Sequence, residues 1–135
     1  MKDTSTTLIL RIDWSELDLF GHVNNVVFYR YIQSARVRFW EQIGLYEMFE
    51  KEKIAPLLAS ATIDFKKPLQ YPGNAIIQYK PAFVKNTSFG LEYAILNDQN
   101  ETTALGRDTM VLYDFNENKK LTIPDNLREN IDNLK

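Results

Sequence analysis

Hydrophobic and polar positions divide the chain into segments of different periodicity. Residues 6–14 alternate in part and are rich in β-favouring types, so we predict a first strand there. From Asn25 to about Leu45, apolar side chains recur at steps of three and four residues, which predicts one long amphipathic helix. The apolar positions of this pattern are Phe28, Tyr31 or Ile32, Ala35, Phe39 and Ile43. Asn24 or Asn25 is a suitable N-cap, and Gly44 is placed to end the helix.

Short apolar runs with β character follow the helix, separated by clusters of Pro, Gly, Asn and Asp. We predict four more strands from them, at about residues 57–65, 75–84, 88–97 and 103–115. The break at residues 97–101, Asn-Asp-Gln-Asn-Glu, is typical of a hairpin, so the later strands are expected to form an antiparallel meander. Residues 122–131 predict a short terminal helix with Pro124 near its first turn, where proline loses no intrahelical hydrogen bond.

The order of these segments predicts a single domain over residues 1–135, because a second domain would have no room for its own core. No internal repeat or linker interrupts the chain. One long helix can cover only one face of a five-stranded sheet, so the other face and the edges stay exposed unless another subunit covers them. We therefore expect a homo-oligomer, either a dimer or a tetramer.

Composition and charge narrow the class of protein. The chain is 44% hydrophobic and 25% charged, as expected for a globular protein, and its net charge of -2 with scattered cations argues against nucleic acid or anionic lipid as partner. The absence of cysteine excludes disulfides, thiol nucleophiles and thiolate metal sites. The N-terminal residues lack a long apolar region, and no stretch is long enough to span a bilayer, so we expect a cytoplasmic protein.

Candidate chemistry is concentrated in residues 13–25, Asp-Trp-Ser-Glu-Leu-Asp-Leu-Phe-Gly-His-Val-Asn-Asn, which join the first strand to the long helix. This segment holds several carboxylates, the single histidine and two asparagines. The first turn of a helix has unpaired N–H groups and a partial positive charge, which can stabilise a developing oxyanion. A carboxylate just upstream can activate water or attack directly.

This segment resembles the hotdog thioesterases, in particular the 4-hydroxybenzoyl-CoA thioesterase-like group. Its Asp-x-x-x-His-Val-Asn-Asn spacing also resembles that of the plant acyl-carrier-protein thioesterases. The resemblance continues along the chain in the central helix, two strands and the tail of the family, at residues 24–36, 63–69, 88–93 and 123–128. It implies an α+β hotdog fold, a curved antiparallel five-stranded sheet wrapped around one long helix. It also implies hydrolysis of acyl thioesters, with acyl-CoA favoured over acyl-carrier-protein substrates.

The resemblance assigns roles to individual residues. Asp18 matches the catalytic carboxylate, acting as general base or nucleophile, and His22 matches a histidine of the active centre. The backbone N–H groups of Asn24, Asn25 and Val26 would polarise the thioester oxygen. The candidates for substrate contacts are Tyr29 near the helix start, and Lys66, Lys67 and Ser88 from the facing subunit. No metal or redox cofactor is expected, because the thiol leaves readily once the carbonyl is polarised.

Two positions depart from the family, and several alternatives stay open. Many relatives have Asp where Glu16 stands, and the plant enzymes have Asn where Phe20 stands. In the structural alternative, Asp18 is an Asx-turn or capping residue, His22 is structural, and Asn24 and Asn25 are caps. Glu16, Lys66 and Lys67 are then solvated surface charges. The functional alternatives are a hotdog dehydratase or hydratase, and an acyl-CoA-binding module without turnover.

Overall fold

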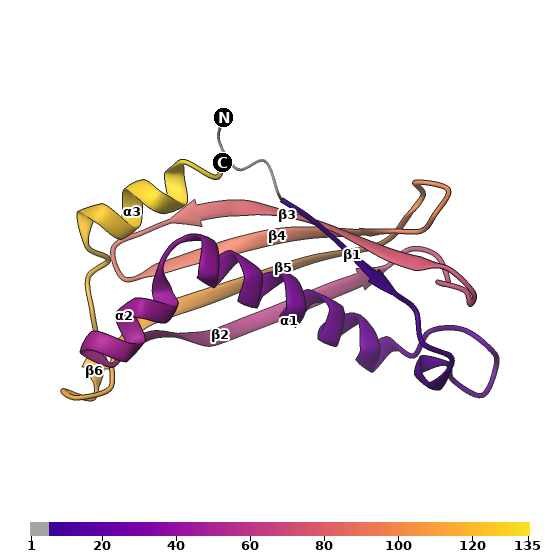
Figure 1. The fold of residues 1–135 in the computed structure, drawn as a ribbon, viewed down its shortest axis with the longest axis horizontal. Coiled ribbons are helices and arrows are strands. Elements are labelled where there is room, and N and C mark those ends of the chain that lie inside the picture. The colour runs from indigo at the N-terminus through magenta and orange to yellow at the C-terminus, as the bar shows by residue number, and fades with distance from the viewer. Residues whose placement is uncertain (1–5) are drawn as a thin grey trace.

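A curved antiparallel sheet wraps around one long helix, α1 (Asn25–Gln42), in a computed structural model that describes residues 6–135 (Figure 1). The long strands run in the spatial order β1-β3-β4-β5-β2, and each pairs antiparallel with its neighbours. They are β1 (Thr7–Arg11), β2 (Ile54–Phe65), β3 (Asn74–Val84), β4 (Ser88–Leu96) and β5 (Thr102–Asp114). This is the predicted α+β architecture, to which a two-residue strand β6 (Lys119–Lys120) adds one short pairing with β5.

Helix α1 is held against the sheet by an apolar face that is almost fully buried. Its buried apolar side chains are Val27, Phe28, Tyr31, Ile32, Ala35 and Phe39. They join sheet residues such as Ile77, Leu91 and Leu112 in one core, and burial of each large apolar side chain contributes about 1.5–3 kcal/mol. The side chain of Asn24 caps the helix by accepting a hydrogen bond from the Val26 N–H at 3.0 Å, as predicted. The N-terminus of α1 therefore has a fixed place at one end of the sheet.

Element boundaries differ from the predictions in two places around α1. The first strand ends at Arg11 instead of residue 14, because Asp13 caps a 3-10 turn, η1 (Trp14–Glu16), that leads the chain away from the sheet. Gly44 does end the long helix, with φ at +83°, but a second helix, α2 (Leu45–Glu52), begins immediately after it. The sequence pattern did not predict α2.

Later boundaries also shift. Strand β2 begins at Ile54, three residues before the predicted start. The terminal helix, α3 (Asp125–Asp132), begins three residues after the predicted start, and Pro124 occupies its N-cap, next to the first turn as predicted. The predicted meander is present as β3-β4-β5. Strand β2, which precedes the meander in the chain, pairs with the side of β5 away from β4 and lies at the edge of the sheet.

A buried polar network connects α1 to the sheet. The Arg36 guanidinium donates from Nε to Asp108 Oδ2 at 2.8 Å, and the Tyr93 hydroxyl donates to the same oxygen. Asp108 Oδ1 accepts the Leu91 backbone N–H at 3.0 Å, so both carboxylate oxygens have partners. The side chains of Arg36 and Asp108 are 8% and 0% exposed. Burial, and then the neighbouring Asp108 charge, raise the pKa of Tyr93 above its ordinary value, which keeps the hydroxyl protonated as a donor.

Among residues 6–135, none of the helices combines the length and apolar character needed to cross a membrane. The expectation of an N-terminus without a targeting sequence falls partly on residues 1–5, which lie outside the described residues.

Candidate active site

The loop that carries Asp18 is closed at its base by backbone hydrogen bonds. Leu17 and Val23 form an antiparallel bridge, and the Asp18 N–H donates to the His22 carbonyl at 2.7 Å. At the turn, Gly21 has φ at +85°, and its N–H donates to the Asp18 carbonyl at 3.2 Å. These bonds fix the backbone of Asp18 relative to the strand-to-helix connection.

The Asp18 carboxylate uses its two oxygens differently. Oδ1 accepts the backbone N–H groups of Phe20 at 2.9 Å and His22 at 3.1 Å, which is the Asx-turn bonding of the structural alternative. Oδ2 accepts no hydrogen bond from the described residues, and the side chain is exposed. The turn thus orients the carboxylate and leaves one oxygen available for chemistry.

Of the three backbone N–H groups proposed to polarise a carbonyl, two already have partners. The Asn24 N–H donates to the Glu16 carbonyl at 2.9 Å, and the Val26 N–H donates to the Asn24 side chain at 3.0 Å. The Asn25 N–H, in the first turn of α1, has no hydrogen-bond partner within the described part of the chain. Because this end of the helix carries a partial positive charge, the Asn25 N–H is the donor that remains for an anionic oxygen.

A surface groove of about 410 Å³ brings the candidate groups together. It is lined by Asp18, Val23, Asn25, Phe28, Phe65, Lys66, Lys67 and Pro68. The loop is tied to the far wall by the Val23 N–H, which donates to the Leu69 carbonyl at 2.9 Å, and by a bridge between His22 and Gln70. The Phe28 and Phe65 rings pack edge to face, with their centroids 5.1 Å apart, and form an apolar wall of the groove.

Lys66 and Lys67 lie beside Asp18 of the same chain, whereas the resemblance assigned them to the facing subunit. Their environments differ. The Lys67 ammonium pairs with Glu101 at 2.6 Å, and the hydrogen bond from Lys67 is the main cause of the lowered pKa of Glu101. No carboxylate of the described residues forms an ion pair with Lys66, so Lys66 is the cation available to a bound anion.

Three other predicted residues are not part of this groove. Ser88 pairs with Val111 of β5, whereas Phe65 pairs with Ala104, so they are separated by roughly 23 Å along the sheet at about 3.3 Å per residue. Tyr29 is 41% exposed on α1 and is not among the lining residues. Within residues 6–135, no hydrogen bond joins the His22 imidazole to the Asp18 carboxylate.

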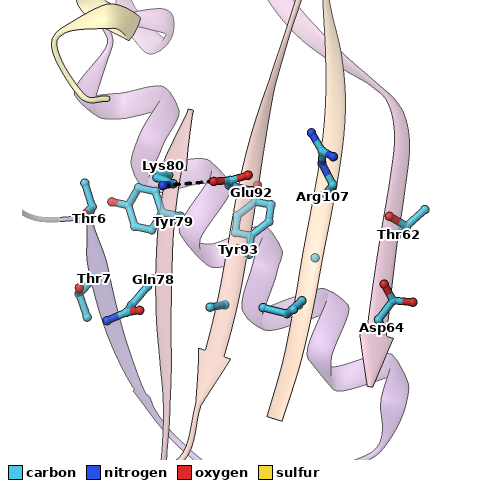
Figure 2. Close-up of a pocket in the computed structure, with 13 residues that line it drawn as sticks. Thr6, Thr7, Thr62, Asp64, Gln78, Tyr79, Lys80, Glu92, Tyr93 and Arg107 are labelled. Carbon is cyan, nitrogen blue, oxygen red and sulfur yellow. Dashed lines mark ion pairs between the residues drawn. The ribbon is translucent and has the colours of Figure 1, made fainter. Parts of the chain in front are cut away.

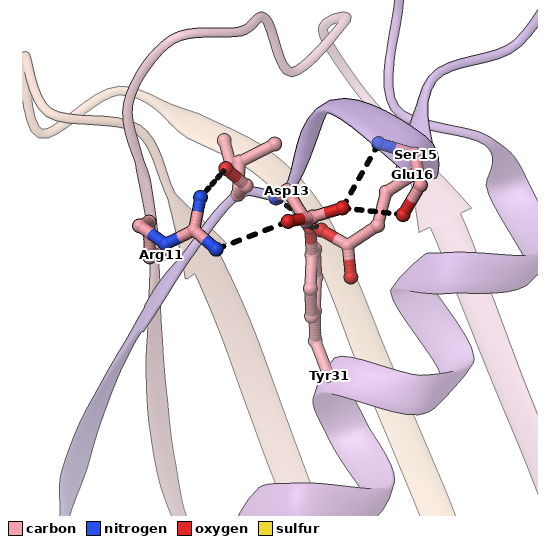
Figure 3. Close-up of polar contacts among 6 residues, drawn as sticks. Arg11, Asp13, Ser15, Glu16 and Tyr31 are labelled. Atoms are coloured by element: carbon pink, nitrogen blue, oxygen red, sulfur yellow. Dashed lines mark hydrogen bonds and ion pairs between the residues drawn. The ribbon is translucent and has the colours of Figure 1, made fainter.

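Glu16 is anchored to α1, and the interpretation of this residue as a solvated surface charge is wrong (Figure 3). Its Oε1 accepts the Asp13 N–H at 2.8 Å and the Tyr31 hydroxyl at 2.8 Å. Burial, followed by the Glu16 hydrogen bond, raises the pKa of Tyr31 above its ordinary value. Hydrogen bonds from Ser15 and Arg11 lower the pKa of Asp13 to about 2. The spacing Asp13-x-x-Glu16 is a capping-box signature, so the sequence itself carries a signal for this turn.

A second hollow, larger than the Asp18 groove, lies across the sheet face opposite α1 (Figure 2). It has a volume of about 640 Å³, and charged and polar side chains border it, including the Lys80–Glu92 ion pair at 3.3 Å. It lacks a helix N-terminus beside an available carboxylate oxygen. The smaller groove at Asp18 is the one that has both of these features.

Comparison with known proteins agrees with this architecture. Residues 12–131 match the sequence profile of the thioesterase-like superfamily. The chain is 25% identical over 120 residues to YsmA of Bacillus subtilis, covering 89% of this chain and 80% of YsmA. Its structure is similar to that of PA5185 from Pseudomonas aeruginosa, with a TM-score of 0.83, 24% identity, and coverage of 96% of this chain and 90% of that chain.

A further similar structure is Slr0204, a 1,4-dihydroxy-2-naphthoyl-CoA thioesterase from Synechocystis. The TM-score is 0.83 at 19% identity, and 96% of each chain is covered. The curved sheet around α1 is thus the hotdog fold that the sequence predicted. Since the profile spans nearly the whole length, the chain belongs to the thioesterase-like superfamily.

Proposed function

We propose that this protein hydrolyses acyl thioesters, with acyl-CoA as the favoured substrate class. The observation that carries the proposal is the shared groove, which is bordered both by Asp18, with its available Oδ2, and by Asn25, with its available N–H. A base and an oxyanion donor on one groove are the two groups that acyl transfer to water requires. The superfamily supports a thioester as the substrate.

In the proposed reaction, Asp18 Oδ2 takes a proton from water as the water oxygen bonds to the thioester carbonyl carbon. The carbonyl electrons move to oxygen, and the Asn25 N–H stabilises that oxyanion, an effect worth about 3 kcal/mol for one donor. Collapse of the intermediate breaks the C–S bond, and the sulfur leaves as the thiol with the proton from Asp18. His22 acts through its backbone: its carbonyl accepts the Asp18 N–H, and its own N–H donates to Asp18 Oδ1. These two bonds orient Asp18.

The same placement serves direct attack by Asp18 on the carbonyl carbon, giving a mixed anhydride that water then cleaves. A single turnover in ¹⁸O-labelled water detects the anhydride route when water attacks the anhydride at the Asp18 carboxyl carbon. Label appears in the Asp18 carboxylate only if the anhydride forms and water attacks at that carboxyl carbon, whereas with a general base all label goes to the acid product.

Thiol release from a panel of aliphatic and aromatic acyl-CoA esters tests the proposal directly. The similar protein Slr0204 acts on an aromatic acyl-CoA, and the apolar wall of Phe28 and Phe65 suits an aromatic or aliphatic acyl group, so both classes belong in the panel. Acyl-carrier-protein thioesters with the same acyl groups serve for comparison. A rate no higher than the uncatalysed rate on every thioester would refute hydrolysis.

Lys66 is proposed to bind a phosphate of coenzyme A. Replacing it by alanine should raise KM for acyl-CoA roughly fivefold, the equivalent of about 1 kcal/mol for a partly exposed charge contact. KM for an acyl-N-acetylcysteamine thioester, which lacks phosphates, should stay the same. Lys67→Ala is the matched control, since Glu101 already pairs with that ammonium. Equal changes in both variants, or a change with the truncated substrate, would contradict the role of Lys66.

The free edge of β2 supports the proposal of a homodimer. Within residues 6–135, β2 pairs on one side with β5, and its residues 54–63 carry no charge. Leu57 and Leu58 are 42% and 46% exposed on this strand. A long, uncharged edge strand is a surface for pairing with another chain, so we propose antiparallel pairing of two β2 strands about a two-fold axis.

Sedimentation equilibrium tests this assembly. The wild type should have twice the mass of the chain, and Leu58→Lys should shift it towards the monomer, because a charge at the edge opposes strand pairing. Leu105→Lys, at a 44% exposed position of β5 on the opposite sheet face, is the control and should remain dimeric. A monomeric wild type would exclude the dimer, and dissociation of both variants would exclude the β2 edge.

A further inference from the structure

Glu16 contacts both sides of the connection between β1 and α1 (Figure 3). Its backbone carbonyl accepts the Asn24 N–H at 2.9 Å, next to the proposed oxyanion donor. Its side-chain Oε1 accepts the Tyr31 hydroxyl and the Asp13 N–H, each at 2.8 Å. Glu16 itself stands two residues before Asp18 in the chain. One residue thus connects the start of the Asp18 loop to the first turn of α1.

Tyr31 is the fixed end of this connection. Its side chain is 3% exposed and packs in the core beside Phe28, with ring centroids 6.2 Å apart. Six residues of helix separate it from Asn25, roughly 9 Å at about 1.5 Å per residue. Because the helical backbone between them is hydrogen-bonded, the Tyr31 hydroxyl has a set position relative to the Asn25 N–H.

We propose that Glu16 and Tyr31 form a positioning pair that sets the separation between the Asp18 carboxylate and the Asn25 N–H. This inference rests on the proposed thioester hydrolysis and names how its two reacting groups are held. Neither Glu16 nor Tyr31 lines the groove, so both act through Asp18 and Asn25 and not on the substrate. A displacement of about 1 Å at a catalytic group can reduce the rate about 100-fold, which gives such a pair a measurable effect.

Three variants separate positioning from simple stabilisation. Glu16→Ala removes the acceptor of both side-chain hydrogen bonds, whereas Glu16→Gln keeps a carbonyl oxygen that can accept them. Tyr31→Phe removes only the donor. The matched control is Tyr79→Phe, because the Tyr79 hydroxyl also donates to a side chain of α1, Gln42 Oε1 at 3.0 Å, and the residue is 2% exposed, but it lies far from Asp18.

With the best substrate of the wild type, Glu16→Ala should lower kcat by about 10- to 100-fold and Tyr31→Phe by about 10-fold, with KM little changed. Glu16→Gln should restore most of the kcat that Glu16→Ala loses, and Tyr79→Phe should have the kcat of the wild type. Equal kcat for Tyr31→Phe and Tyr79→Phe, whether high or low, would overturn the inference. So would failure of Glu16→Gln to exceed Glu16→Ala.

Amide hydrogen exchange gives a readout that does not need activity. The Phe20 and His22 N–H groups bond to Asp18 Oδ1, so their exchange reports directly on the Asp18 turn. Glu16→Ala and Tyr31→Phe should accelerate exchange at these two amides, whereas Tyr79→Phe should not. If the wild type hydrolyses no thioester, the proposed function fails while the exchange rates still decide whether the pair holds Asp18. Unchanged exchange in Glu16→Ala and Tyr31→Phe would refute the pair.

Discussion

Asp18→Asn should lower kcat for thioester hydrolysis by about 100- to 10,000-fold, the range that a positioned general base contributes. The substitution replaces Oδ2, the oxygen without a partner among the described residues, by an amide nitrogen that cannot take a proton from water. The amide oxygen can still accept the N–H groups of Phe20 and His22, so the turn should be retained. Thiol-release kinetics and a circular dichroism melting curve measure the two consequences separately.

The control for this substitution comes from the same loop. Asp13 also accepts a backbone N–H two residues ahead, that of Ser15 at 3.0 Å, but it does not border the groove. Asp13→Asn therefore changes a carboxylate of similar local bonding and should keep the kcat of the wild type. Activity of Asp18→Asn equal to that of the wild type would remove Asp18 from the mechanism. An equal loss in both variants would assign the effect to the loop and not to the carboxylate.

Asp108→Asn should reduce the free energy of unfolding by about 3–5 kcal/mol, a large part of the stability of a small domain. The Arg36 guanidinium would be left in the core without an opposite charge. The carboxylate accepts hydrogen bonds at both oxygens, whereas the amide has only one acceptor oxygen. The substitution therefore loses either the bond from the Leu91 N–H or the bonds from Arg36 and Tyr93. Urea unfolding followed by circular dichroism measures the change.

The matched substitution for Asp108→Asn is Glu92→Gln, on the neighbouring strand. Glu92 pairs with Lys80 at 3.3 Å, and the side chains of Lys80 and Glu92 are 64% and 43% exposed, so loss of this surface ion pair should cost less than about 1 kcal/mol. A double variant, Arg36→Met with Asp108→Leu, should recover part of the stability, because apolar groups of similar volume replace the buried pair. If Asp108→Asn and Glu92→Gln lost the same free energy of unfolding, the buried network would contribute little to stability.

Local patterns predicted most of the helices and strands, because these follow from contacts close in the sequence, whereas the arrangement of the sheet around α1 came from the family resemblance. The cap of α1 needs only Asn24 and the N–H two residues later, and Gly44 ends the helix by its own conformation. Helix α2 was missed because its eight residues include one fully buried side chain, Leu45, and are held by packing between α1 and β2. The early end of β1 depends on the Asp13 cap, which the Asp-x-x-Glu spacing marks but the alternation of apolar residues does not.

The candidate site depends in part on contacts between residues far apart in the sequence. The spacing from Asp18 to Asn25 placed both groups at the start of α1, and the structure puts them on one groove. The Glu16 carbonyl accepts the Asn24 N–H, and the Asn24 side chain accepts the Val26 N–H. These two acceptors leave the Asn25 N–H as the available donor. The partner of Glu16, Tyr31, is fifteen residues away in sequence, so no local pattern identifies it.

The Asp18 turn also bears on how such proteins diverge. Its outermost side chains, Leu19 and Phe20, are 90% and 80% exposed, and the bonds that orient Asp18 come from the backbone of Phe20 and His22. Mutations at the tip can therefore accumulate without cost to the carboxylate, provided that position 20 does not become proline, which has no N–H to donate. Duplicated genes can therefore acquire new side chains at the tip of this loop while the bonds that orient Asp18 stay the same.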